Sequence, residues 1–471
     1  MQAGWKEKAE AWMKAHEEEY LRELSELIAI RSVSEPEAEK PFGEGCRTVL
    51  AKALDIGEKH GLTPASFDGK VGLLRLPNGR PRSIGLWGHL DVVPEGDGWI
   101  RDPYRMTREG DVIYGRGVSD NKGPALAAVY VLRCIRDLGI ELPFEPRVYL
   151  GTDEEKGMKD VMWFREYHQI PDYNLIPDSS FPVCHAEKGI LEVTLVSDSA
   201  LSDLFLDATG GLVTNMVPEK ASVRIKETAV ALAKIGMLSS PFTVERSPEG
   251  IRITAEGKAM HAARPYEGVN AVRLITDMLV STGLAAGEDR EILSFLSGVN
   301  RDCDGTFFDI AMEDEISGKL TCVGSILRMR EGKPALTLNI RYPVTAKGEE
   351  LFEKIAGKCR EEGYRAELLR DSKPAYVPKD SPFVETLTGI IRELLGGEQE
   401  PYAMAGGTYA RKLPNAVAFG PGGLPVPDDL PQLGGAHQHD EGVYYPNLLK
   451  AAVIYVLALI GLGEKMKEER L

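Results

Sequence analysis

The chain has 471 residues, 43% hydrophobic and 27% charged, a composition ordinary for a globular protein but long for one core, so two or three domains are expected. The net charge of −16, from 56 basic and 72 acidic side chains, argues against nucleic acid and against an anionic membrane surface as the main partner. Six scattered cysteines without a C-x-x-C pair, and a charged N-terminus without the apolar core of a signal peptide, favour the reducing cytoplasm.

The N-terminal part of the chain predicts an α/β layer. Apolar residues at helical spacing predict a helix over residues 11–30. Further helices and short apolar runs that end in polar residues alternate after it: helix 44–60, run 84–87, helix 123–138, run 148–150 and run 175–176. This alternation indicates a largely parallel sheet, and such sheets bind ligands beyond the carboxyl ends of their strands.

The pattern changes near residue 188 and changes back near residue 373. Alternating strands and intervening helices in between indicate an antiparallel α+β domain: strands 191–196, 250–256 and 336–341, and helices 270–282 and 348–362. Afterwards come a helix at 383–395, a strand at 417–420 and a final helix after Pro446. We therefore predict a domain made from residues 1–186 and 374–471, with residues 187–373 inserted.

The most apolar stretch, residues 451–463, is too short to span a bilayer and predicts a buried C-terminal helix. No membrane association is therefore expected.

His89 and Asp91 follow directly after one predicted strand. In a zinc site, His89 would bind the metal and Asp91 would hold the other ring nitrogen. A strand-end histidine followed by a turn aspartate is the alternative, and H-x-D alone does not decide between them.

Asp120 lies in a glycine-rich segment, residues 114–123, immediately before a predicted helix. It would be a carboxylate that bridges two metals. A phosphate-binding loop is the rival interpretation, but the spacing matches neither G-x-G-x-x-G nor G-x-x-x-x-G-K-[ST].

Further candidates are acidic and imidazole side chains at other strand ends and loops. Glu154 and Glu155 follow a buried strand, so one could take a proton while the other binds a metal. Asp178 and the pair His437 and His439 could be ligands or ordinary loop residues. His261 lies in the inserted segment, where it could polarise a carbonyl or simply lie on a surface loop.

Taken in order, seven segments resemble the M20 family of di-zinc peptidases, most closely its bacterial dipeptidase V branch, the Xaa-His or β-Ala-Xaa dipeptidases. The segments are GHLDVVP (88–94), YGRGVSDNKG (114–123), GTDEEKG (151–157), LIPDSSFPVCHAEKG (175–189), MHAARPYEGVNA (260–271), GGTYAR (406–411) and AHQHDEG (436–442). The resemblance implies a phosphorylase/hydrolase-like α/β catalytic domain, a mainly parallel sheet between helices, with an enlarged α+β lid.

The resemblance also implies a ligand set for two zinc ions, which cobalt or manganese could replace. One ion would be held by His89, Asp120 and Asp178, and the other by Asp120, Glu155 and His437. Glu154 would be the general base and Asp91 the partner of His89. His437 is preferred to His439 because the family pattern places Asp-Glu three residues after the histidine, as in Asp440-Glu441. The bond between Asp120 and Asn121 would be cis.

Three positions of the lid match substrate-side residues of the branch. Asn215 and His261 would face the scissile carbonyl, and Arg341 would bind the free carboxylate of a dipeptide, which suits its planar, bidentate guanidinium. Gly407 and Thr408 would supply donors near the same carboxylate. Because the enlarged lid of the branch mimics a partner subunit, a monomer is expected. Cys184 and His185, which the family pattern does not require, are interpreted as structural.

The implied reaction is hydrolysis of dipeptides by a water that bridges two zinc ions, with Glu154 as base and with Asp91 or Glu154 receiving the free amine. An M20-type deacylase of N-acyl amino acids and a non-catalytic binding module on the same fold are the alternatives.

Overall fold

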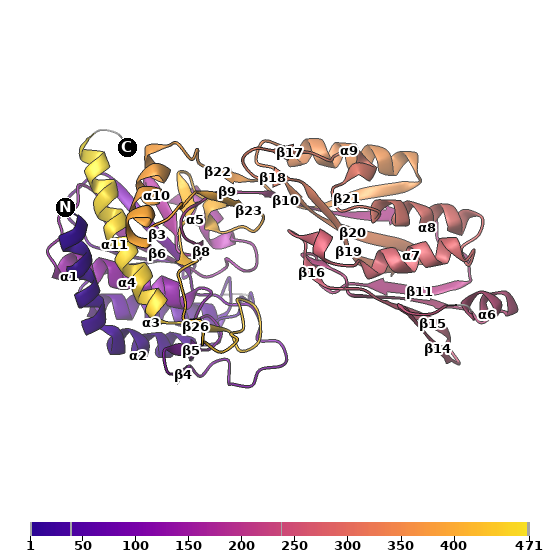
Figure 1. Ribbon diagram of the computed structural model, residues 1–471, viewed down its shortest axis with the longest axis horizontal. Helices are drawn as coiled ribbons and strands as arrows, with labels where there is room; N and C mark the ends of the chain where they lie inside the picture. Colours follow the sequence, from indigo (N-terminus) through magenta and orange to yellow (C-terminus); the bar gives the residue numbers. More distant parts are fainter. Residues whose placement is uncertain (1, 38–39, 237, 469–471) are drawn as a thin grey trace. The chain divides into compact units, whose positions relative to one another are not determined.

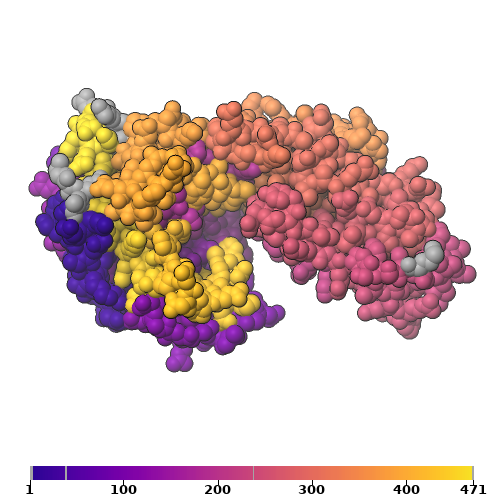
Figure 2. Space-filling model, viewed as in Figure 1, coloured from indigo at the N-terminus to yellow at the C-terminus, as the bar shows by residue number. Residues whose placement is uncertain are grey.

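The computed structural model describes residues 2–37, 40–236 and 238–468, and these fold into two compact units. Unit 1 comprises Met1–Ala186, Tyr376–Tyr402 and Gly407–Leu471, and unit 2 comprises Glu187–Ala375 and Ala403–Gly406. Figure 2 shows that indigo and purple segments from the start of the chain and orange to yellow segments from its end share the surface of unit 1. The domain boundaries drawn from the sequence stay a prediction.

Unit 1 is built around a nine-stranded sheet whose centre is parallel. Its strand order is β1-β2-β6-β3-β7-β24-β9-β22, with β23 on β9. The central parallel strands are β6 (Glu145–Gly151), β3 (Ser83–His89), β7 (Tyr173–Ile176) and β24 (Ala416–Ala418). The others are β1 (Thr63–Phe67), β2 (Val71–Arg75), β9 (Cys184–Glu187), β22 (Ala375–Tyr376) and β23 (Tyr402–Met404). Every residue of β3 is buried, as expected for a parallel strand covered on both faces.

The helices of unit 1 pack on this sheet and on one another. They are α1 (Gln2–Ala15), α2 (Glu17–Ile28), α3 (Glu44–Lys59), α4 (Lys122–Asp137), α5 (Lys159–Tyr167), α10 (Pro382–Leu395) and α11 (Pro446–Lys467). Helices α1 and α11, from opposite ends of the chain, lie side by side, and α11 also packs on α4 and α10 (Figure 1). Ser381 starts α10 by accepting a hydrogen bond from the backbone N–H of Val384, and Pro382 takes the first helical position.

The single helix predicted over residues 11–30 is wrong, because the chain forms two helices there. Helix α1 ends at Ala15 and α2 begins at Glu17. At His16, between them, the ring Nδ1 hydrogen-bonds the carbonyl oxygen of Trp12 (2.7 Å), and the two rings stack. The backbone N–H of His16 is shared between the carbonyl oxygens of Trp12 (3.2 Å) and Met13 (3.1 Å), as is common at a helix end. Apolar periodicity does not reveal such an end.

Helix α11 is the buried C-terminal helix that the sequence predicts, although it is longer than the apolar stretch suggested. Its 22 residues have the length and composition of a helix that could cross a membrane. However, 83% of its most apolar 18-residue stretch is buried inside the structure. This burial is typical of the core helix of a globular unit.

Unit 2 contains an antiparallel eight-stranded sheet in the order β14-β15-β13-β11-β19-β20-β10-β21. The strands are β10 (Gly189–Ser197), β11 (Phe205–Gly210), β13 (Lys220–Ile225), β14 (Phe242–Ser247), β15 (Gly250–Glu256), β19 (Thr321–Arg330), β20 (Lys333–Tyr342) and β21 (Tyr364–Ser372). The helices are α6 (Ala229–Ile235), α7 (Ala271–Ser281), α8 (Glu288–Val299) and α9 (Gly348–Glu361). Helix α7 packs on β13, β15 and α8, and α9 packs on β10 and β21 (Figure 1).

Short elements complete both units. They are β4 (Thr107–Glu109), β5 (Val112–Tyr114), β8 (Ser179–Ser180), β12 (Met216–Val217), β16 (Met260–His261), β17 (Glu313–Asp314), β18 (Gly318–Lys319), β25 (Pro421–Gly422) and β26 (Gly442–Tyr444), with 3₁₀ turns η1 (Pro265–Glu267), η2 (Thr306–Phe308) and η3 (Tyr409–Lys412). In unit 1, β26 pairs with β5 and thereby brings residues from the end of the chain beside the segment that carries Asp120.

Leu457→Ala tests the role of α11 as a core helix. Leu457 is 1% exposed in the core of unit 1, so the cavity left by the substitution should cost about 2–5 kcal/mol of unfolding free energy. Urea unfolding followed by circular dichroism measures the loss. Lys450→Ala, at an exposed position of the same helix, is the control and should change little; an equal loss in both variants would contradict a buried α11.

Candidate active site

Three predicted site segments follow neighbouring parallel strands at the same edge of the sheet. His89 is the last residue of β3 and pairs with Gly151, the last residue of β6, after which the chain continues to Glu154 and Glu155. Asp178 follows β7 on the other side of β3. The structure thus brings these side chains together where the sequence pattern expects a ligand.

The carboxylate of Asp120 contacts two histidines with separate oxygens. Its Oδ1 lies 3.0 Å from Nε2 of His89, and its Oδ2 lies 3.1 Å from Nε2 of His437. Asp120 comes from the segment between β5 and α4, and its bond to Asn121 is cis, as the resemblance implies. One carboxylate therefore stands between two imidazoles that are 348 positions apart in the sequence numbering (437 − 89).

Each imidazole has a second carboxylate beside it. Nε2 of His89 lies 3.7 Å from Oδ2 of Asp178, and Nε2 of His437 lies 3.0 Å from Oε2 of Glu155. The ring of His439 is 61% exposed, and the ion pair described for it is with Asp440, at 3.9 Å. The geometry groups His437, rather than His439, with Asp120 and Glu155.

This donor set fits divalent cations. Two ligands on one tetrahedral zinc, at about 2.0–2.2 Å from the metal, lie roughly 3.4 Å from each other. The nitrogen–oxygen separations of 3.0–3.7 Å bracket that value. The carboxylates of Asp120, Glu155 and Asp178 also concentrate negative charge that a cation would offset.

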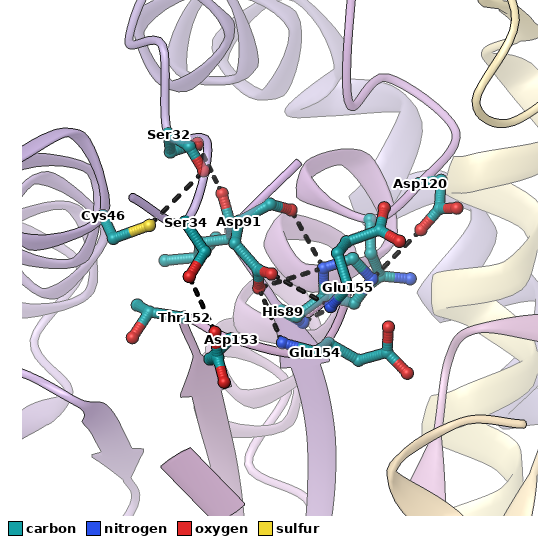
Figure 3. A network of polar contacts seen from close by, with 12 residues as sticks. Ser32, Ser34, Cys46, His89, Asp91, Asp120, Thr152, Asp153, Glu154 and Glu155 are labelled. Atoms are coloured by element: carbon teal, nitrogen blue, oxygen red, sulfur yellow. Dashed lines mark hydrogen bonds and ion pairs between the residues drawn. The ribbon is translucent and has the colours of Figure 1, made fainter. Parts of the chain in front are cut away.

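Asp91 contacts both the ring of His89 and the backbone of Glu154 and Glu155 (Figure 3). The closest partner of His89 Nδ1 is the backbone oxygen of Asp91 (3.0 Å), and the carboxylate lies at 3.4 Å. The same carboxylate accepts hydrogen bonds from the backbone N–H groups of Glu154 (3.1 Å) and Glu155 (3.0 Å). Asp91 is fully buried, and each of its carboxylate oxygens accepts a backbone hydrogen bond. Of the two residues that the sequence analysis suggested for the free amine of the substrate, Asp91 is therefore poorly placed to bind it.

Glu154 is buried and chemically distinct from its neighbour. Burial raises the pKa of Glu154 well above its ordinary value, and the negative charges of Asp178 and Glu155 act in the same direction. Its Oε1 has no hydrogen-bond partner within the described chain, and in Figure 3 its carboxylate extends to the same side of Asp91 as those of Glu155 and Asp120. A carboxyl group with a raised pKa suits proton uptake and release.

The neighbouring carboxylates raise the pKa values of His89 and His437. Hydrogen bonds to Asp120 and Glu155 raise the pKa of His437 to about 10. Burial opposes protonation of His89, but hydrogen bonds to Asp120 and Asp91 outweigh it and hold the pKa of His89 well above its usual range. Hydrogen bonds to the same histidines, against the effect of burial, lower the pKa of Asp120. A bound cation would instead require neutral imidazoles, so metal binding should release protons.

Glu441, which the sequence analysis used only to choose between the two histidines and gave no role of its own, holds the segment that carries Asp120. Its Oε1 accepts hydrogen bonds from the backbone N–H of Ser119 (2.9 Å) and Asp120 (3.1 Å). Its Oε2 accepts from the N–H of Gly117 (3.1 Å) and from Arg116 Nη1 (2.8 Å). Both charged side chains are at most 1% exposed, and Gly117 has a φ of 94°, a region that favours glycine.

Asn121 ties the same segment to the strand ends. Its side-chain oxygen accepts from the N–H of His89 (3.2 Å), and its Nδ2 donates to the backbone oxygen of Pro177 (2.6 Å) and to Oδ1 of Asp178 (3.2 Å). The H-x-D and Asp-Glu-Glu patterns give no signal for this residue or for Glu441, because their partners lie far away in sequence.

Three residues that the sequence predicts to contact the substrate form local hydrogen bonds. In unit 2, Nδ1 of His261 accepts a hydrogen bond from the N–H of Ala263 (3.2 Å), and the backbone oxygen of Asn215 accepts one from the N–H of Ala262 (2.8 Å). In unit 1, the hydroxyl of Thr408 caps η3 by accepting from the N–H of Ala410.

Two other predicted positions lie in close-packed surroundings. Gly407, in unit 1, lies so close to the Arg411 guanidinium that a Cβ would lie 2.0 Å from it. Arg341, in unit 2, is 5% exposed.

The side chains of Cys184 and His185 form hydrogen bonds to backbone oxygens. Sγ of Cys184 donates to the backbone oxygen of Ala186, and Nδ1 of His185 hydrogen-bonds the backbone oxygen of Val377. Neither belongs to the groups of possible metal ligands among the described residues.

Comparison with known proteins decides the family. The profile of the peptidase family M20/M25/M40 matches residues 85–460. This chain belongs to that family. It is therefore a hydrolase of peptide bonds, and the resemblance drawn from its seven sequence segments is confirmed.

Relatives and solved structures match this M20 chain over nearly its whole length. A Bacillus subtilis protein named "Putative dipeptidase YtjP" is 34% identical over 462 residues, covering 95% of this chain and 98% of that protein. A Staphylococcus epidermidis protein named "Putative dipeptidase" is 31% identical over 482 residues, covering 97% and 99%.

The solved structure of human carnosine dipeptidase 1 has a TM-score of 0.57 at 17% identity, covering 98% of this chain and 100% of that one. Aminoacylhistidine dipeptidase of Vibrio alginolyticus has 0.55 at 13%, covering 94% and 96%. At these identities the structures establish the fold, which confirms the predicted fold class.

His437→Ala and His439→Ala form a matched pair that tests the choice of histidine. Removal of His437 deletes a contact to both Asp120 and Glu155, so the number of metal ions bound per chain should fall. Removal of the exposed His439 should leave the metal content unchanged. Elemental analysis after dialysis against buffered zinc measures both, and loss of metal from His439→Ala alone would reverse the assignment.

Glu441→Gln tests the restraint on Asp120. The amide would turn a donor toward backbone donors and leave Arg116 without its buried counter-charge, so metal affinity should fall by about 10–100-fold. Competition with a chromophoric chelator measures the affinity. Glu393→Gln, an exposed glutamate of α10, is the control, and unchanged affinity in Glu441→Gln would refute the restraint.

Proposed function

We propose that this M20 protein hydrolyses dipeptides that carry a free amino group and a free carboxylate, with two zinc ions as cofactors. The observation that carries the proposal is the placement of the two Asp120 oxygens against His89 and His437. Full-length relatives named as dipeptidases support the substrate class.

One ion would be held by His89, Asp178 and Asp120, and the other by His437, Glu155 and Asp120. Cations bound there would polarise the scissile carbonyl and lower the pKa of a water molecule between them, so that it can attack near neutral pH. Cobalt and manganese also suit this nitrogen and oxygen donor set.

Glu154 would take the proton of the attacking water at its carboxylate and deliver it to the leaving amine. Its raised pKa brings proton uptake and release nearer to neutral pH than an exposed glutamate would allow. The N–H groups of Glu154 and Glu155 bound to Asp91 keep both carboxylates fixed, one for the proton and one for the metal.

His261 and Asn215 would stabilise the oxyanion that forms on the carbonyl. Because Nδ1 of His261 accepts a hydrogen bond from Ala263, its neutral ring carries the proton on Nε2, where it can be donated. Arg341 would bind the substrate carboxylate through its guanidinium, with donors from Gly407 and Thr408. Closure around the substrate would exclude water.

The protein would work as a monomer on small peptides in the cytoplasm. The six cysteines are all free thiols, which agrees with a reducing compartment.

Glu154→Gln and a substrate panel test the reaction. Metal-stripped protein is reloaded with zinc, cobalt or manganese and assayed on a free dipeptide, its amide, a tripeptide and an N-acetyl amino acid. We expect metal-dependent cleavage of the dipeptide, and a fall in kcat of about 10²–10⁴-fold in Glu154→Gln with unchanged metal content. Cleavage of the N-acetyl amino acid alone would assign the protein to the deacylases, and metal binding without turnover would leave a binding module.

A further inference from the structure

A continuous path of hydrogen bonds runs through unit 2 from Arg341 to Thr214. Oδ1 of Asn339 accepts from Nε of Arg341 (2.8 Å), and Nδ2 of Asn339 donates to Oε1 of Glu192 (2.9 Å). The same Oε1 accepts from the hydroxyl of Thr214 (2.6 Å). Thr214 directly precedes Asn215.

The sheet register places these groups on one face. Glu192 of β10 lies directly opposite Asn339 of β20, and Arg341 follows two residues along the same strand. Asn339 is fully buried, and Nη1 of Arg341 donates to the backbone oxygen of Ala405 (2.9 Å). The long arginine side chain is thus held from Nε and from Nη1, which reduces the freedom that binding would otherwise remove.

The amide of Asn339 satisfies both of its neighbours. The side chain must accept from Arg341 and donate to Glu192, and a carboxylate or an aliphatic group cannot do both. Asn339 is also uncharged, so it orients the guanidinium without neutralising it.

The other end of the path reaches the residues beside His261. The backbone oxygen of Asn215 accepts from the N–H of Ala262, and Met216 pairs with His261 between β12 and β16. The hydroxyl of Thr321 donates to the backbone oxygen of Ala262 (2.9 Å), and Thr321 lies opposite Arg341 in the pairing of β19 with β20. These hydrogen bonds and the pairing of β19 with β20 therefore connect the Asn215 end of the path back to the strand position of Arg341.

We infer that Glu192 and Asn339 are positioning residues, which set the distance between the group that binds the substrate carboxylate and the groups that face the scissile carbonyl. This inference rests on the proposed function, because it takes the ligand of Arg341 to be a dipeptide carboxylate. A fixed spacing between these groups would favour dipeptides over longer peptides.

Asn339→Asp and Thr214→Val test the two ends of the path, with Arg341→Met as reference. In Asn339→Asp the new carboxylate competes with the substrate for Arg341, so KM for a free dipeptide should rise about tenfold. Its kcat, and kcat/KM for the dipeptide amide, should fall only about threefold, as in Thr214→Val, because both variants loosen residues 211–217. Thr214→Val should lower kcat about threefold without raising KM, because it loosens only the Asn215 end.

Thr337→Val is the matched control. Thr194 and Thr337 form another hydrogen-bonded pair across the same two strands, two positions from Glu192 and Asn339, with no bond to Arg341 or Thr214. This variant should keep the kinetics of the natural protein. An equal rise of KM in Thr337→Val would show a general effect of disturbing the sheet and would overturn the inference.

Amide hydrogen exchange of residues 211–217 separates the inference from the proposed function. Faster exchange in Asn339→Asp and Thr214→Val, but not in Thr337→Val, is expected even if no free dipeptide is cleaved. If Arg341→Met raises KM while Asn339→Asp alters neither KM nor exchange, the positioning role is refuted and the proposed function stands. If the natural protein cleaves no dipeptide, the proposed function fails and exchange alone decides whether the path positions the loop.

Discussion

The carboxylate of Asp120 must face His89 with one oxygen and His437 with the other, although the three residues come from distant parts of the chain. A buried carboxylate is costly unless it is paired, and an irregular segment between a strand and a helix has little intrinsic reason to hold one orientation. Glu441 binds three backbone N–H groups of that segment, and Asn121 fixes its end to the strands that carry His89 and Asp178. The pairing of β26 with β5 brings Glu441 there from the end of the chain.

This arrangement divides the acidic residues into groups with different tasks. Asp91 uses both oxygens on backbone N–H groups and keeps the Glu154–Glu155 segment in place. Asp120 faces the two histidines, and burial with neighbouring negative charge keeps the pKa of Glu154 high. The same residue type can therefore hold backbone, bind a cation or carry a proton, depending on which partners the fold places around it.

Much of this could be predicted from residues near each strand end. The apolar runs before His89, Glu154 and Asp178 placed these side chains at one edge of a parallel sheet, and the structure brings them together there. The choice of His437 over His439 came from the family pattern, and it is His437 that lies beside Asp120 and Glu155 in the structure. What stayed hidden depends on partners far apart in sequence: Arg116 with Glu441, and Glu192 with Asn339. The break at His16 was missed for a local reason, since a ring that binds the preceding turn leaves the apolar periodicity intact.

The location of bound metal tests the central claim most directly. Crystals of the zinc-loaded protein, measured on both sides of the zinc absorption edge, should show two anomalous peaks that share Asp120 as a ligand. One should also contact His89 and Asp178, and the other His437 and Glu155. A single peak, or two peaks of which either lacks Asp120, would contradict the account.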